Sequence, residues 1–243
     1  MLRWGTILAA LATWQVGAAF AREGSIFLLS PGEIAAGLVP MLQDVSAREA
    51  LTLTAWEFGI AFVISIVLGT AIAAVLAVTP LSRRSGLVLF QLFVSVPQVA
   101  IYALFVLFLG AGAESKIVFG VTHGMLPVVI GILAAVDGYR SNLPQAVRAM
   151  GGRRWAVVRY AVIPAVLPSA VTSMRLCASL CLLGILIAEL LVSSGGVGRQ
   201  IGTYSGALQI DKLYALVAVV CIAAIVINIL LAIVERRAGR WKA

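Results

Sequence analysis

Three ionisable side chains lie inside long apolar runs of this 243-residue sequence, namely Glu57, His123 and Glu189. An ionisable group at membrane depth usually faces a cavity or a partner, so two carboxyls and an imidazole are compatible with a proton or ion relay. Each has a structural interpretation as well. Glu57 and Glu189 can extend to the membrane interface, and His123 can make a hydrogen bond between helices. Cys177 and Cys181 stand four residues apart without other ligand types, which favours packing over a metal site.

The sequence predicts no catalytic site and no metal site. It has no clustered nucleophile, base and metal-ligand set. It also lacks Gly-x-x-x-x-Gly-Lys-Ser/Thr, the loop whose backbone amides bind nucleotide phosphates. We therefore expect a chain that is not an enzyme, does not hydrolyse ATP and holds no cofactor of its own.

The composition indicates that the segments carrying these residues cross a membrane. The chain is 62% hydrophobic and 12% charged, outside the usual range of soluble domains. A hydrocarbon core of about 30 Å takes about 20 helical residues to cross. The apolar runs are continuous rather than alternating, which favours helices over a barrel. We predict an all-α membrane protein, a single transmembrane domain over residues 1–243, with six spans at 4–21, 54–79, 87–110, 117–136, 169–192 and 213–234.

Topology accounts for the net charge of +8. With six spans, 13 of the 18 Lys and Arg residues fall on one side of the membrane and 5 on the other. Positive residues stay on the cytoplasmic side, so both termini are predicted to be cytoplasmic and nucleic-acid binding loses its support. The first run, followed by Ala19-Phe20-Ala21, also resembles a cleavable signal peptide, whose removal would leave five spans.

Six residues are assigned to a translocation path. Glu189 lies near the outer part of the fifth span, and Glu57 lies nearer the external end of the second. Pro97 removes a backbone hydrogen bond and can kink the third span, which is tolerated beside neighbouring helices or a water-filled cavity. The path residues are Glu57, Pro97, Gln98, Tyr102, Arg175 and Glu189.

The longest cytoplasmic connection, at about 140–168 between the fourth and fifth spans, is basic and amphipathic. Gly151-Gly152 weakens a helix locally and predicts a bend or an end there. A basic amphipathic element of this kind binds either anionic membrane lipid or a protein partner.

This segment resembles a motif of the permease subunits of binding-protein-dependent ABC importers, in the branch that handles nitrate, sulfonates, taurine and related small solutes. The motif reads Glu-Ala-Ala, three residues, Gly, nine residues and Ile-x-Leu-Pro. Here it reads Gln145-Ala146-Val147, then Gly151, then Ala161-Val162-Ile163-Pro164. Residues 107–117 and 188–198 are similar to further stretches of that branch, and together the motifs are specific.

The resemblance implies a coupling helix from Gln145 to Arg154 that sits in a groove of an ATP-binding subunit. It implies two such subunits, which hold ATP and Mg, a second permease copy or paralogue, and an external solute-binding protein, all in a bacterial cytoplasmic (inner) membrane. The residues that the resemblance assigns to coupling are Gln145, Ala146, Val147, Arg148, Met150, Gly151, Arg153, Arg154, Trp155 and Pro164.

Three departures leave the solute open. Glu57 stands where the branch usually has arginine, and Gln98 and Ala103 stand where prolines are expected. The alternative function is an ATPase-independent secondary transporter or channel with Glu57, His123 and Glu189 as its relay. That alternative predicts internal repeats with interrupted helices, which the sequence does not show.

Overall fold

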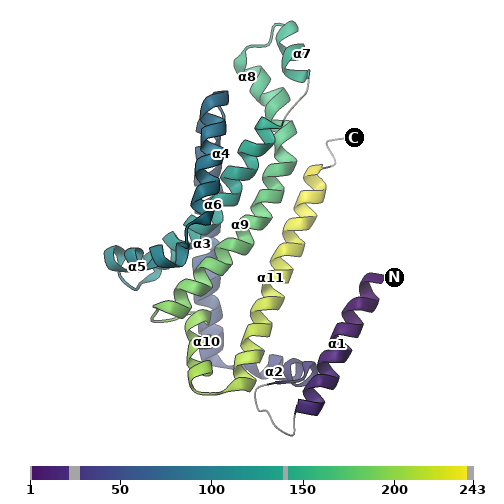
Figure 1. Cartoon of the computed structure of the whole chain (residues 1–243), viewed down its shortest axis with the longest axis vertical. Coiled ribbons are helices and arrows are strands. Elements are labelled where there is room, and N and C mark those ends of the chain that lie inside the picture. Colours follow the sequence, from purple (N-terminus) through teal and green to yellow (C-terminus); the bar gives the residue numbers. More distant parts are fainter. Residues whose placement is uncertain (1, 22–27, 139–141, 240–243) are drawn as a thin grey trace. The chain divides into compact units, whose positions relative to one another are not determined.

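The computed structural model describes residues 2–21, 28–138 and 142–239, and the described residues form helices, turns and bends without a strand (Figure 1). This confirms the all-α prediction. In chain order the elements are α1 (Leu2–Ala21), α2 (Pro31–Gln43), α3 (Val45–Leu76), α4 (Pro80–Ser95), α5 (Gln98–Leu109), α6 (Ala113–Asp137), α7 (Leu143–Ala149), α8 (Arg154–Val157), the π-helix η1 (Val158–Val162), α9 (Ile163–Leu191), α10 (Val197–Gly206) and α11 (Ile210–Gly239).

Four helical stretches among the described residues are long and apolar enough to cross a membrane. These candidate spans are α3, α6, the stretch Arg154–Leu191 and the Ile210–Arg236 part of α11. The pair α4 and α5 makes a fifth candidate if it is counted as one bent span. The helix α1 occupies the position of the first predicted span. The structure thus supports four or five of the six predicted spans.

The predicted span 87–110 is interrupted at Pro97, where a kink was expected. The helix breaks between Ser95 and Gln98, and α4 and α5 meet at an angle of 86° (Figure 1). Pro97 has no backbone N–H, and its ring pushes the preceding Val96 away from helical angles. Val96 is accordingly extended, with φ −75° and ψ 133°. The proline therefore ends one helix rather than kinking a continuous one.

Side-chain caps fix where α2 and α3 begin. The Ser30 hydroxyl accepts the Glu33 N–H, and the Glu33 carboxylate accepts the Ser30 N–H in return, which is a capping box. Asp44 precedes α3, and its Oδ1 accepts the Ser46 hydroxyl and the backbone N–H groups of Ser46 and Ala47. These hydrogen bonds, that of the Ser46 hydroxyl foremost, hold the pKa of Asp44 below its usual value.

Contacts divide the chain into two compact units. The first unit contains Met1–Ala55 and Glu189–Ala223, and the second contains Trp56–Ala188 and Ala224–Ala243. In the second unit α3, α6 and α9 pack through small residues. A Cβ on Gly69 would lie 2.9 Å from the Val128 Cβ, and a Cβ on Gly184 would lie 3.2 Å from the Gly120 Cα. Such close backbone approach is the usual basis of helix packing in lipid.

Candidate functional site

The segment between α6 and α9 is a short helical arm at one end of the second unit (Figure 1). Its helix α7 ends at Ala149, and a turn at Met150–Gly152 leads to α8. Residues 140 and 141, where the predicted coupling segment begins, lie outside the described residues. The predicted end of the helix at Gly151-Gly152 is confirmed, because Gly151 has φ +80° and α7 stops just before it. The segment Gln145 to Arg154, which the resemblance assigns to a coupling helix, thus consists of the end of α7, the glycine turn and the first residue of α8.

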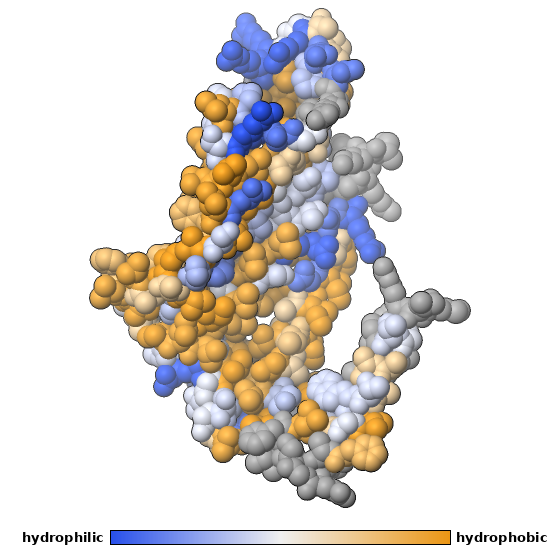
Figure 2. Space-filling view, viewed as in Figure 1, coloured by the Kyte–Doolittle hydropathy of each residue, from blue (hydrophilic) through white to orange (hydrophobic). Residues whose placement is uncertain are grey.

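Exposed apolar and basic side chains share the surface of this arm. Met150 is 80% exposed and Trp155 67%, far more than a side chain that packs within its own chain. Arg148, Arg153 and Arg154 are exposed as well. Figure 2 shows hydrophilic surface gathered at this end of the unit, beyond the hydrophobic surface of its helices. Large apolar groups interleaved with arginine are typical of an interface that a partner covers.

Pro164 sits where the arm joins α9. Because it lacks a backbone N–H, the regular ladder of hydrogen bonds is interrupted there. The Ile163 N–H bonds to the Val158 carbonyl five residues back, so η1 is a single wide turn. Wide turns of this kind are frequent at functional sites.

Gly151→Ala should loosen the turn of the arm. A left-handed backbone costs a residue with a Cβ about 1–2 kcal/mol, so the turn should open about tenfold more often. Hydrogen–deuterium exchange of the Gly151 and Gly152 amides, which bond to the Arg148 and Val147 carbonyls, should rise accordingly. Gly59→Ala is the control, because Gly59 has open space around it and lies in α3. Unchanged exchange in the Gly151 variant would contradict the strained-turn interpretation.

Glu57 forms an ion pair with Lys116 inside the second unit. The Glu57 Oε1 lies 2.5 Å from the Lys116 Nζ, and the two side chains are 0% and 3% exposed. Burial this complete excludes extension of Glu57 to the interface. The pair joins α3 to α6, and it gives Glu57 a partner that the translocation-path assignment did not include.

Glu189 caps the first turn of α10 inside the first unit. Its Oε2 accepts the Gly198 N–H at 2.8 Å, and its Oε1 accepts the Thr54 hydroxyl at 2.7 Å. The Thr54 oxygen in turn accepts the Val197 N–H at 2.9 Å. Gly196 is required beside them, because its φ is +102° and a Cβ there would overlap the Glu189 carboxyl. Glu189 and Thr54 therefore each accept one of the backbone N–H groups that a helix start leaves unpaired.

Two further ion pairs join helices of the second unit. Arg175 Nη1 donates to the Glu235 Oε2 at 2.8 Å, linking α9 to α11. Arg83 Nε donates to the Asp137 Oδ1 at 2.9 Å, linking α4 to α6. Both pairs are partly exposed, and pairs of this kind contribute little to stability.

The other candidate residues have separate surroundings. Tyr102 is buried against Phe119, with ring centroids 4.9 Å apart, and the His123 Nδ1 lies 3.1 Å from the Phe119 carbonyl oxygen of its own helix. Pro97 is exposed at the break, and Gln98 begins α5 half-buried. None of Glu57, Gln98, Tyr102 and Arg175 lines the groove of the second unit that Arg84, Ser85, Val88, Leu89 and Leu92 form. The assignment of these residues to a path stays a prediction.

Sequence reasoning missed the partners rather than the charged residues themselves. It assigned no role to Lys116, Thr54, Asp137 or Glu235. For the ion pairs the sequence did contain a clue, because the acid and the base of each pair were predicted on the same side of the membrane. Matching opposite charges by membrane depth would have placed Lys116 among the candidate partners of Glu57, and Asp137 among those of Arg83.

The family described as binding-protein-dependent transport system inner membrane component matches residues 65–240 of this sequence. The chain belongs to this family. That stretch contains the glycine turn, the wide turn and two of the three ion pairs described above. The Lys116 side of the Glu57 pair falls within it, whereas Glu57 itself lies before it.

Relatives in this family transport small solutes. The chain is 23% identical over 242 residues to the taurine transport system permease protein TauC of Escherichia coli (strain K12), covering 98% of this chain and 88% of that protein. It is 24% identical over 235 residues to a protein named as an aliphatic sulfonates transport permease, SsuC, of Bacillus subtilis (strain 168), covering 96% and 84%.

The fold agrees with the family. A chain of the MetNI methionine ABC transporter, solved in inward-facing conformations, superposes with a TM-score of 0.68 at 19% identity, covering 82% of this chain and 98% of that one. The protein is thus a multi-pass membrane component of a binding-protein-dependent transport system, and its function is that of an ABC importer permease.

Proposed function

We propose that this permease works with two separate ATP-binding subunits, which dock on the arm formed by α7, the glycine turn and α8. The observation that carries the proposal is the arm itself. It presents Met150 and Trp155 largely uncovered beside three exposed arginines, at the position of the resemblance motif. The chain has no phosphate-binding loop, so the ATP and Mg are assigned to those partners.

The remaining parts of the assembly follow from the importer class. A second permease copy or paralogue completes the path, and an external binding protein delivers the solute. ATP binding brings the two ATP-binding subunits together and moves the arms, so that nucleotide favours one of two openings. TauC and SsuC support taurine, a sulfonate or a similar small solute as the cargo.

We place the arm on the cytoplasmic side of a bacterial inner membrane, with six spans and both termini cytoplasmic. In this topology α1 is the first span and the bent pair α4 and α5 is the third. The arm and the Arg83–Asp137 pair at the start of α4 lie toward the same end of the second unit (Figure 1), which agrees with the excess of positive charge on one side.

The alternative of a proton or ion relay loses its support. Glu57 is paired with Lys116, Glu189 caps α10, and His123 contacts a carbonyl of its own helix. Each group therefore has a local structural partner. Membership of a binding-protein-dependent family disagrees with an ATPase-independent transporter as well.

Charge reversal on the arm tests the proposed docking. In Arg153→Glu/Arg154→Glu, repulsion replaces attraction at two exposed positions, and we expect ATP-driven uptake and co-purification of the ATP-binding subunit in gentle detergent to fall more than tenfold. Arg48→Glu is the control, an exposed arginine in the first turn of α3. Full uptake by the double variant, with no ATP-binding subunit accompanying the wild-type chain, would overturn the proposal.

A further inference from the structure

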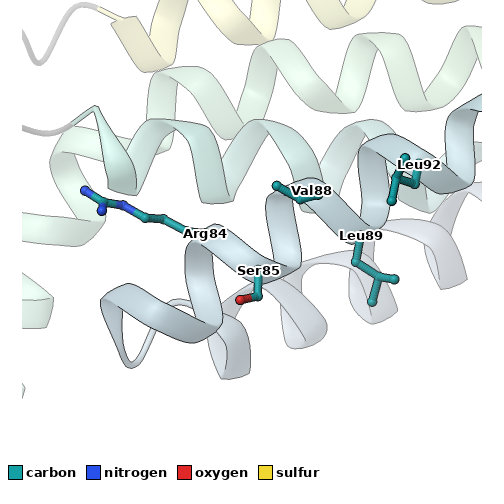
Figure 3. Close-up of a pocket in the computed structure, with 5 residues that line it drawn as sticks. All are labelled: Arg84, Ser85, Val88, Leu89 and Leu92. Atoms are coloured by element: carbon teal, nitrogen blue, oxygen red, sulfur yellow. The ribbon is translucent and has the colours of Figure 1, made fainter.

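The side of α4 that faces away from the protein core carries a groove. It has a volume of about 460 Å³ and is lined by Arg84, Ser85, Val88, Leu89 and Leu92. Figure 3 shows Arg84 and Ser85 at one end of the groove and Leu92 at the other, with Val88 and Leu89 between them. The lining is thus polar at one end and apolar along the rest.

The opposite side of α4 is the one that packs inside the protein. A Cβ on Gly86 would lie 2.9 Å from the Leu76 Cδ1 and 3.4 Å from the Leu133 Cδ1, and Leu87 and Phe90 pack on the same core. Val88, Leu89 and Leu92 are instead 52–61% exposed. Because the helix already has its protein contacts, these three side chains face outward.

The two arginines at the start of α4 have different roles. Arg83 is 18% exposed and donates to Asp137 at 2.9 Å, whereas Arg84 is 75% exposed and its Nε is 3.8 Å from the same Asp137 oxygen. One carboxylate thus faces two guanidinium groups, which leaves one positive charge in excess. That charge is on the side chain that borders the groove.

We propose that this groove binds one anionic phospholipid. The Arg84 guanidinium and the Ser85 hydroxyl hold the phosphate, and an acyl chain lies along Val88, Leu89 and Leu92. Arginine suits phosphate through charge and its fork of donors. The lining from Arg84 to Leu92 extends about 12 Å along the helix, since eight residue steps rise 1.5 Å each. Charge complementarity selects a lipid over a second copy of this chain, because an amphiphile with an anionic head matches both ends of the groove.

Lipid retention by the purified transporter tests this site. In detergent, native mass spectrometry should show dioleoyl phosphatidylglycerol retained about fivefold better than dioleoyl phosphatidylcholine, the preference expected of one basic side chain at a membrane surface. Arg84→Gln should remove that preference, and Arg48→Gln, which deletes an exposed arginine without a groove, should keep it. Leu89→Asn/Leu92→Asn should lower retention of both lipids.

Three results would overturn the proposal. The first is an unchanged preference in Arg84→Gln. The second is displacement of phosphatidylglycerol by an equal concentration of glycerol 3-phosphate, which would show a site for a free anion. The third is a Leu89→Asn/Leu92→Asn variant that retains lipid but falls apart into single permeases by light scattering, which would assign the groove to a second copy.

Discussion

Glu57→Ala should lower the free energy of unfolding by about 3–5 kcal/mol, the usual cost of leaving one member of a buried ion pair alone. The variant removes the carboxylate but leaves the Lys116 ammonium, which is 3% exposed and joins α6 to α3 through this contact. At this degree of burial, water cannot solvate the ammonium group in place of the lost carboxylate. Unfolding of the purified protein by increasing mole fractions of sodium dodecyl sulfate measures the change.

Two companion variants identify the cause. Glu49→Ala removes an exposed acid from the same helix and should change the unfolding free energy by less than about 0.5 kcal/mol. Glu57→Leu/Lys116→Met removes both charges and should recover most of the loss, because apolar groups of similar volume can replace a buried pair. If the double variant is as unstable as Glu57→Ala, the uncompensated charge is not the reason.

Glu189→Ala should cost about 3 kcal/mol in the same measurement. The carboxyl group accepts the Gly198 N–H and the Thr54 hydroxyl, and removing it leaves both donors buried without an acceptor. The first turn of α10 also loses a group that suits the positive end of a helix. Exchange of the Val197 and Gly198 amides should rise, since the start of α10 is held by these contacts.

The comparison for this prediction is Leu191→Ala. Leu191 is 50% exposed at the end of α9, two residues from Glu189, and its loss should change the unfolding free energy by less than about 1 kcal/mol. Protected amides at Val197 and Gly198 in Glu189→Ala would show that other contacts hold α10. That result would return Glu189 to the list of residues free to line a path.

Most helices were predictable because periodicity and hydrophobicity act locally. The predicted spans 54–79, 117–136, 169–192 and 213–234 all fall on helices of the structure. Their true starts are earlier for α3 and α9, at Val45 and Ile163, because caps and turns decide where a helix begins. The length of an apolar run gives the part inside lipid, not the whole helix.

The break at Pro97 and the partners of the charged residues were not predictable to the same degree. A proline in an apolar run is compatible with a kink or with an end, and the choice depends on neighbouring helices that the sequence does not specify. Glu57 was likewise recognised as notable, yet only the packing of α3 on α6 brings Lys116 within 2.5 Å of it. A shared membrane depth reduces the number of possible partners for a charged residue, but it does not tell which helix supplies the partner.

The wide turn η1 has a consequence for the direction in which the arm faces. An α-helix advances about 100° per residue, and a turn closed over five residues instead of four holds one residue more. Arg154 and Trp155 therefore point in a direction rotated by roughly 100° about the helix axis, compared with a regular α-helix that continued from α9 toward the arm. The wide turn Val158–Val162 thus determines the direction in which these two side chains face, and the positions of the apolar residues along α9 do not.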